Sequence, residues 1–84
     1  MDRPAPMRAR RLNSSLIDRI LFDDEAETLT VWFKQSGKYI YHGVPRAMYD
    51  ALARAASAGR FFNEVIRGRF ECEPDPPRRH YPLD

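Results

Sequence analysis

A small set of aromatic and basic side chains carries the chemistry that this chain of 84 residues can perform. Aromatic rings stack on unpaired bases, and arginine and lysine side chains bind phosphate. A surface that combines the two is typical of proteins that bind single-stranded nucleic acid. The candidate residues for such a surface are Trp32, Lys34, Lys38, Tyr39, Tyr41, Arg60, Asn63, Arg67 and Arg69.

Other kinds of site find little support in the sequence. The two histidines, His42 and His80, have no further histidine or cysteine at metal-ligand spacing and form no recognisable arrangement with a nucleophile. The acidic residues at 23–27 crowd one predicted turn, and carboxylates need a pocket before they become catalytic. The single cysteine, Cys72, forms neither an internal disulfide nor a metal site alone. We therefore expect a binding module that is not an enzyme and that holds no cofactor and no metal.

Charge and proline content divide the chain into three parts. Residues 1–12 carry four arginines against one aspartate, which is typical of a basic flexible arm. Residues 71–84 carry four of the seven prolines and more acidic than basic side chains, which indicates a disordered tail. The folded domain is therefore expected at 13–70.

The sequence shows no sign of a membrane protein. No apolar run reaches the roughly 18–20 residues of a membrane span, and the first residues lack the hydrophobic stretch of a signal peptide. A single cysteine is also usual in a reducing compartment. We therefore expect a cytoplasmic protein with no membrane partner.

Hydrophobic spacing predicts the strands that would position the candidate side chains. Branched or alternating apolar residues predict strands at about 17–22, 28–34 and 38–42. The connections between them are short, which favours an antiparallel meander.

Two helices are predicted after the strands. Apolar residues at spacings of three and four mark a helix at about 45–56, with Pro45 at its first position, where the missing N–H costs nothing. Ser57 suits the N-cap of a second helix, since its hydroxyl can accept from a free backbone N–H, and Gly68 suits the position just past its end. Three strands and two helices in the order βββαα can cover each other's apolar faces in a two-layer α+β domain.

The loop between the last two predicted strands decides which way the tyrosines face. A three-residue loop pairs Phe33 with Tyr39 and places both tyrosines of the central Y-x-Y on the helix-covered face. A two-residue loop pairs Phe33 with Lys38 and places them beside Trp32. Gly37 favours the three-residue loop, because the third loop position takes a positive φ that glycine adopts most easily. We therefore predict that the tyrosines mainly build the core, with direct ligand stacking as the alternative.

The opposite face of the sheet would then carry Trp32 beside lysines, with Trp32 and Ile40 as cross-strand neighbours. Such a tryptophan can stack on a base, contact a partner protein or a second copy of the chain, or pack against Ile40, and these alternatives stay open. The residues predicted on this face are Thr30, Trp32, Lys34, Lys38, Ile40 and His42.

A polar stripe follows the second predicted helix. Arg60, Asn63 and Arg67 recur at i, i+3 and i+7, and Arg69 follows. The arginines of this stripe could bind phosphate groups. Glu64 can neutralise Arg60 at i+4, so a solvated helix face is the alternative.

Five short motifs occur in a distinctive order and spacing. They are SSLI at 14–17, LTVWF at 29–33, the central Y-x-Y, GVP at 43–45 and GRFFNEVIRGRF at 59–70. Together they resemble the KTSC domain, a small bacterial domain found alone and at the C-terminus of some lysyl-tRNA synthetases. The family-like positions are Tyr39, Tyr41, Gly43, Pro45, Tyr49, Gly59, Phe62, Asn63, Ile66 and Arg67.

The resemblance implies a link to RNA through the synthetases, but it implies no mechanism. Trp32 and Leu21 depart from the family pattern, which makes the strand surface of this chain more apolar. Our leading hypothesis is a small non-catalytic module that binds RNA or another nucleic acid through the basic and aromatic residues above. The alternative is a module for protein–protein interaction or homodimerisation through the strand face that carries Trp32 and Ile40.

Overall fold

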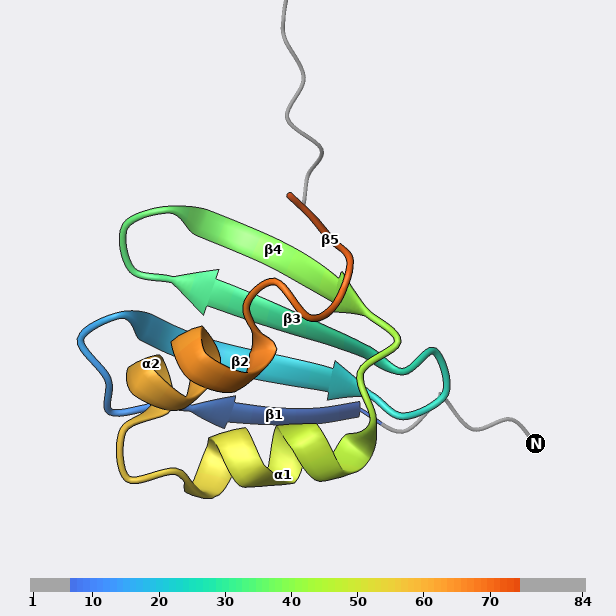
Figure 1. The fold of residues 1–84 in the computed structure, drawn as a ribbon, viewed down its shortest axis with the longest axis horizontal. Coiled ribbons are helices and arrows are strands. Elements are labelled where there is room, and N and C mark those ends of the chain that lie inside the picture. The colour runs from blue at the N-terminus through green and yellow to red at the C-terminus, as the bar shows by residue number, and fades with distance from the viewer. Residues whose placement is uncertain (1–6, 75–84) are drawn as a thin grey trace, which may run out of the picture.

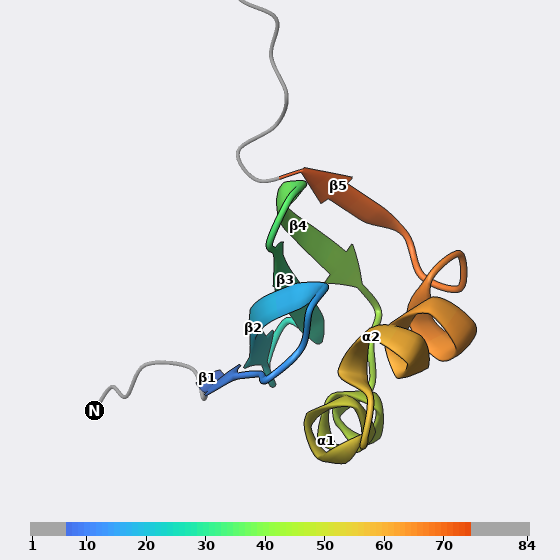
Figure 2. The same ribbon diagram turned by 90° about the vertical axis from the view of Figure 1, so that its left-hand side faces the viewer.

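The computed structural model describes residues 7–74, which form an antiparallel sheet with helices packed on one face (Figure 1). Figure 2 shows the sheet and the helices as separate layers, so the predicted α+β class is confirmed. The strands are β1 Met7–Arg11, β2 Ile17–Asp23, β3 Thr28–Phe33, β4 Gly37–His42 and β5 Cys72–Pro74, and they lie in this order across the sheet. The helices are α1 Arg46–Arg54 and α2 Ala58–Phe61, and α2 continues into the π-helix η1 Phe62–Ile66.

The sheet has five strands, so the predicted three-stranded meander is wrong in its count. Both additional strands lie at edges, in segments predicted as the flexible arm and the disordered tail. β1 pairs with β2, with Arg10 opposite Ile20, and β5 pairs with β4, with Cys72 opposite Tyr41. Every residue of β1 is exposed, because backbone hydrogen bonds rather than buried side chains hold it, and hydrophobic alternation could not reveal it. Residues 1–6 of the predicted arm and 75–84 of the predicted tail lie outside the described residues.

The three central strands lie within one residue of their predicted positions. β2 carries a bulge between Ile17 and Arg19, and the resulting shift in alternation brings Ile17 into the core together with Ile20. The turn before β2 is held by Ser14, whose Oγ accepts hydrogen bonds from the N–H groups of Leu16 and Ile17 at 3.1 and 3.2 Å.

The hairpin between β3 and β4 has a three-residue loop, as predicted, but this loop begins one residue earlier than expected. Phe33 therefore pairs with Gly37, and Val31 pairs with Tyr39, so the predicted pairing of Phe33 with Tyr39 is wrong by two residues. An even shift leaves every side chain on its face. Both tyrosines of the Y-x-Y accordingly lie on the helix-covered face, as predicted. Gly37 takes a φ of 94°, which glycine adopts without steric cost.

Capping residues mark the starts of the helices. The Oγ of Ser57 accepts a hydrogen bond from the Arg60 N–H at 3.4 Å, so the predicted N-cap is confirmed. Pro45 is the N-cap of α1 rather than its first residue. The second predicted helix changes from α to π geometry, in which the Arg67 N–H donates to the Phe62 carbonyl, five residues earlier, at 2.8 Å. A single π turn is rare and is frequently found at functional sites.

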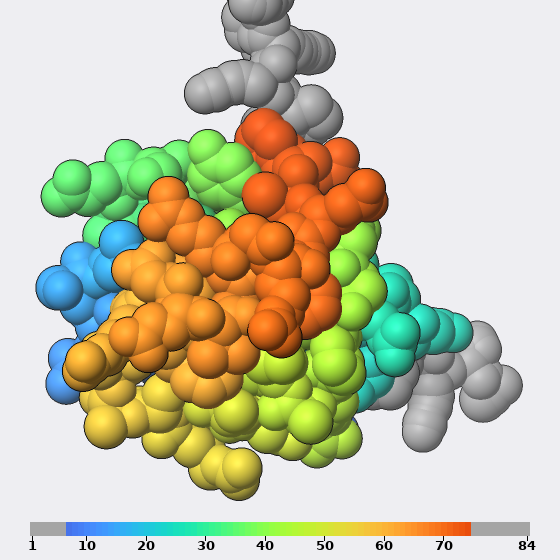
Figure 3. All heavy atoms as spheres, in the orientation of Figure 1, coloured from blue at the N-terminus to red at the C-terminus, as the bar shows by residue number. Residues whose placement is uncertain are grey.

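The core lies between the sheet and the helices. Phe22 of β2 stacks on Tyr49 of α1 with ring centroids 5.4 Å apart, and Phe33 of β3 meets Phe62 of η1 edge to face at 5.2 Å. In the space-filling view of Figure 3 the side chains of the helices cover this face of the sheet. The most deeply buried large side chains are Ile17, Ile20, Phe22, Leu29, Val31, Val44, Leu52 and Ile66.

Candidate functional site

The nine residues predicted to form a binding surface do not meet at one place. Successive residues of a strand point to opposite faces of a sheet, so Lys38 and Tyr39 of β4 lie on different sides. One group lines a pocket on the helix-covered side. A second group lies on the opposite side of the sheet, which we call the open face.

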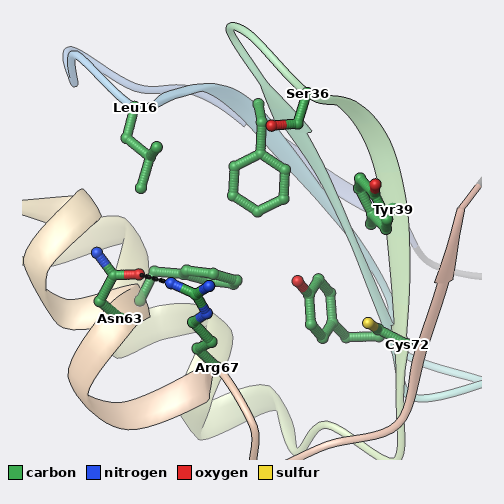
Figure 4. Close-up of a pocket in the computed structure, with 9 residues that line it drawn as sticks. Leu16, Ser36, Tyr39, Asn63, Arg67 and Cys72 are labelled. Atoms are coloured by element: carbon green, nitrogen blue, oxygen red, sulfur yellow. Dashed lines mark hydrogen bonds between the residues drawn. The ribbon is translucent and has the colours of Figure 1, made fainter.

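A pocket of about 220 Å³ lies between β4, β5 and η1 (Figure 4), and we call it the tyrosine pocket. Four of the predicted residues line it, namely Tyr39, Tyr41, Asn63 and Arg67. Figure 4 shows Asn63 and Arg67 extending from the helix on one side, with Ser36 and Tyr39 across from them on the hairpin. The other lining residues are Leu16, Phe33, Ser36, Phe62 and Cys72.

Four aromatic rings form the wall of the tyrosine pocket. Tyr39 meets Phe33 edge to face, with ring centroids 5.9 Å apart. Phe62 meets Phe33 in the same way at 5.2 Å and Tyr41 at 5.4 Å. Edge-to-face contact is an arrangement that aromatic pairs prefer, so the rings hold one another in place. Both tyrosines therefore pack against the core, as predicted, and also line a pocket that opens to solvent.

Tyr41 is the most deeply buried polar residue of the pocket, with 6% of its surface exposed. Burial raises the pKa of its phenol above the ordinary value of 10.0, and the neighbouring Cys72 raises it further, while Arg67 acts in the opposite direction. The hydroxyl therefore keeps its proton at neutral pH and can both donate and accept a hydrogen bond.

Arg67 brings a positive charge to the rim of the pocket. Its Nη1 donates to the Oδ1 of Asn63 at 3.3 Å, as the dashed line in Figure 4 shows. Among residues 7–74 no carboxylate lies within ion-pair distance of this guanidinium, whereas Arg60 on the same helix pairs with Glu64 at 3.2 Å. The neutral amide of Asn63 thus orients Arg67 without cancelling its charge.

A row of basic side chains flanks Trp32 on the open face. Strand pairing places Arg11 opposite Arg19, Arg19 opposite Trp32, and Trp32 opposite Lys38. The guanidinium carbon of Arg19 lies 4.6 Å from the centroid of the Trp32 ring, and the Nζ of Lys38 lies 5.3 Å from it. Both distances fall within the roughly 6 Å range of a cation–π interaction. Asp18 lies 3.3 Å from Arg11 and 4.0 Å from Arg19.

The predicted contact between Trp32 and Ile40 as cross-strand neighbours is wrong. Ile40 lies opposite Thr30, and Trp32 lies opposite Lys38, because the hairpin pairs two residues away from the expected register. Leu21 lies opposite Thr30 on its other side. The aliphatic side chains of the open face therefore occupy the row next to the basic one.

The remaining candidates join neither group. Lys34 is exposed in the hairpin loop, and Arg60 and Arg69 are exposed on the helix-covered side of the molecule. His42, predicted on the open face, places its Nε2 3.0 Å from the Oε2 of Glu73, which joins β4 to β5 through their side chains.

Several members of both groups were missed by the sequence analysis. Arg11 joins the basic row only because β1 pairs with β2, and Cys72 joins the pocket only because β5 returns beside β4. No local pattern marks either residue. Arg19 could have been found, since alternation around the buried Ile20 places it on the open face. Ser36 lines the pocket from the hairpin loop, whose start was predicted one residue too late.

Two kinds of feature are absent from the described part of the chain, residues 7–74. No group of three or more histidine, cysteine, aspartate or glutamate side chains gathers there in a way that could hold a metal ion. No helix there is both long and apolar enough to cross a membrane.

Comparisons with known proteins point to one family. Residues 13–70 match the family model described as the KTSC domain. A KTSC domain protein from Yersinia pestis, known from a crystal structure, is 36% identical with a TM-score of 0.78, and the match covers 82% of this chain and 97% of that one. A protein from Tsukamurella paurometabola is 34% identical over 61 residues, which are 73% of this chain and 91% of the relative. A lysine–tRNA ligase from Nostoc punctiforme is 34% identical over 59 residues, which are 70% of this chain but only 10% of the ligase.

Proposed function

This chain belongs to the KTSC domain family, and from that premise we propose that it is a small module that binds single-stranded nucleic acid, RNA in particular, on the open face of its sheet. One observation carries the proposal, namely the row in which Arg19 and Lys38 flank the ring of Trp32. The relative named lysine–tRNA ligase supports RNA as the nucleic acid. The proposed module binds RNA and catalyses no reaction.

Trp32 offers a ring on which an unpaired base can stack. Arg19 and Lys38 lie over this ring, but a cation–π contact at an exposed site is worth only about 0.5–1 kcal/mol. Stacking of a base on an aromatic side chain is worth about 1–3 kcal/mol. A base can therefore replace the cations over the ring, and the Arg19 side chain can then turn toward a phosphate of the same strand. Bases that are not paired are the ones available for such stacking.

The basic row contains Arg11, Arg19 and Lys38 side by side on the sheet. Within residues 7–74, the carboxylate of Asp18 lies within ion-pair distance of both arginines. Ion pairs between exposed side chains contribute only about 0–1 kcal/mol, so phosphate oxygens can compete with Asp18 for the two arginines. A polyanion is therefore the partner that this charge pattern fits.

The same charges disfavour homodimerisation through the open face. In a two-fold symmetric dimer centred on Trp32 the patch meets its own copy, which brings Arg19 and Lys38 close to the same cations of the second chain. Like charges brought together at an interface cost several kcal/mol, and the centres of interfaces are depleted of charged residues. RNA is for this reason preferred over a second copy of the chain.

The test uses Trp32, the one tryptophan of the chain, as a fluorescent reporter. The full chain is titrated with single-stranded RNA and with duplex RNA of the same sequence at low and at high salt. We expect quenching by the single strand that weakens as salt rises, because phosphate contacts release counterions. We expect weaker quenching by the duplex. Unchanged fluorescence at low salt would contradict the proposal.

A matched pair of variants tests where the RNA binds. Arg19→Gln removes a cation beside Trp32 and should weaken binding. Arg54→Gln removes an exposed cation at the end of α1, on the helix-covered side, and should leave binding unchanged. Equal losses in the two variants would indicate attraction by the overall charge instead of a site on the open face.

A further inference from the structure

The tyrosine pocket lies across the sheet from the open face and has no part in the function proposed above. We propose that it is a separate binding site for one nucleotide, with the base among the aromatic rings and the phosphate on Arg67. The chemistry it recognises is an aromatic heterocycle that carries a phosphate. Both a free mononucleotide and a terminal nucleotide of an RNA strand present this chemistry.

The size of the pocket suits a single ring system. Pockets for drug-sized ligands usually measure about 300–1,000 Å³. The tyrosine pocket, at about 220 Å³, is smaller than these. It has room for one base but not for a dinucleotide or for several residues of a peptide. The sugar and the phosphate of the ligand would lie at its open rim, where Arg67 is exposed.

The wall of the pocket is preorganised for a planar aromatic group. Tyr39, Phe33, Phe62 and Tyr41 form a continuous chain of edge-to-face contacts. Rings that hold one another in place lose little freedom when a ligand arrives, so little binding free energy is spent on ordering them. Every base has a π-face that can pack against such rings.

Hydrogen-bond donors and acceptors both lie among these rings. The hydroxyl of Tyr41 keeps its proton and can donate or accept, and Ser36 adds a second hydroxyl. Asn63 uses its Oδ1 to accept from Arg67, which leaves its NH₂ as a donor. The edge of a base also carries donors and acceptors side by side. A purely hydrocarbon ligand would form no hydrogen bond with these groups.

The charge of the pocket selects an anion. None of the described residues that line it is acidic, and Arg67 is its only basic residue among them. Its guanidinium is held by the neutral Asn63 at 3.3 Å, and no carboxylate of residues 7–74 lies within ion-pair distance to cancel its charge. The planar fork of an arginine matches the geometry of phosphate oxygens. Arg67 is the C-cap of η1, and π turns are often found at functional sites.

An NMR titration of the isotope-labelled full chain tests the proposal. The probes are the four ribonucleoside monophosphates, the matching nucleosides, and N-acetylphenylalanine as an aromatic carboxylate. We expect the monophosphates to shift the signals of Ser36, Tyr39 and Arg67. We expect each nucleoside to bind at least about tenfold more weakly than its monophosphate, because it lacks the charge-assisted contact to Arg67.

Variants of exposed residues keep the test independent of folding. Arg67→Gln should abolish the preference for the monophosphate over the nucleoside, and Asn63→Ala should reduce it, because Arg67 loses its orienting partner. Arg54→Gln is the matched control and should leave the preference unchanged. Trp32→Ala should also leave it unchanged while it weakens RNA binding on the open face, so the two proposals fail or succeed separately.

A further probe distinguishes an RNA end from a free nucleotide as the ligand. Tighter binding of a 5′-phosphorylated trinucleotide than of a mononucleotide would support an RNA end as the ligand, and equal or weaker binding would support a free nucleotide. Three results would overturn the proposal. These are no shifts in the pocket at about millimolar nucleotide, an undiminished phosphate preference in Arg67→Gln, and tighter binding of N-acetylphenylalanine than of any nucleotide.

Discussion

The guanidinium carbon of Arg19 lies 4.6 Å from the centroid of the Trp32 ring, directly across the paired strands β2 and β3. This contact places a charge and a ring side by side before any ligand is present. Substitutions can separate the contribution of the ring to RNA binding from that of the charge. Trp32→Ala removes the ring and keeps the cations, and Arg19→Gln removes one cation and keeps the ring.

Trp32→Ala should lower the affinity for single-stranded RNA about 5- to 150-fold, which corresponds to the loss of about 1–3 kcal/mol of base stacking. The affinity is measured by the fluorescence anisotropy of a labelled RNA, since the variant lacks its tryptophan. Circular dichroism checks that the variant is folded. A folded variant with unchanged affinity would show that no base stacks on Trp32.

Arg19→Gln should reduce the dependence of RNA affinity on salt. Each phosphate contact on a single strand contributes about 0.7 to the slope of log K against log salt concentration, so the slope should fall by about that amount. The affinity of the wild-type chain and of the variant is measured at four or more salt concentrations, with Arg54→Gln as the control. Parallel lines for all three proteins would mean that Arg19 contacts no phosphate.

Tyr41→Phe should make the stability of the fold less sensitive to alkaline pH. Burial raises the pKa of Tyr41 in the folded chain above its ordinary value of 10.0. Below that value both the folded and the unfolded chain keep the proton, and the stabilising contribution is fully present. Above it the unfolded chain loses the proton first, so the free energy of unfolding falls as pH rises.

The measurement for Tyr41→Phe is urea unfolding between about pH 8 and pH 11, a range that spans the ordinary tyrosine pKa. The free energy of unfolding should fall less steeply in the variant than in the wild-type chain. Some slope should remain, because burial also raises the pKa of Tyr49. Identical slopes would mean that Tyr41 ionises equally easily in both states.

Removal of β5 should expose the edge of β4. The N–H of His42 donates to the carbonyl of Glu71 at 2.9 Å, and Cys72 lies opposite Tyr41. A chain that ends at Phe70 should therefore exchange the amide hydrogen of His42 faster. A chain that ends at Pro74 keeps β5 and serves as the control. Slow exchange at His42 in the shorter chain would contradict the role of β5 as an edge strand.

Local patterns were enough to predict the centre of the fold. Apolar residues predicted β2, β3 and β4 because each of these strands sends alternate side chains into the core beneath the helices. Ser57 predicted the start of α2 because an N-cap acts on the backbone of its own first turn. The face of the tyrosines was predicted correctly despite a wrong register, because an even shift along a strand does not change its faces.

The two edge strands could not be predicted in the same way. β1 and β5 are joined to the sheet by backbone hydrogen bonds, which every residue except proline can make, so their side chains carry no pattern. In addition, the first segment was predicted to be a flexible arm because it is rich in arginine, and the last a disordered tail because it is rich in proline. Their place in the sheet depends on pairing with a neighbouring strand that is distant in the sequence or carries no local signal of the pairing.

Residue types alone suggested candidate side chains for binding, but not which of them lie together in the fold. Strand alternation sends Lys38 and Tyr39 to opposite faces, while the packing of η1 against the sheet brings Arg67 to the same pocket as Tyr39. Cys72 reaches that pocket only through the return of β5. These groupings arise from contacts between segments far apart in the chain, and such contacts leave no trace in local spacing.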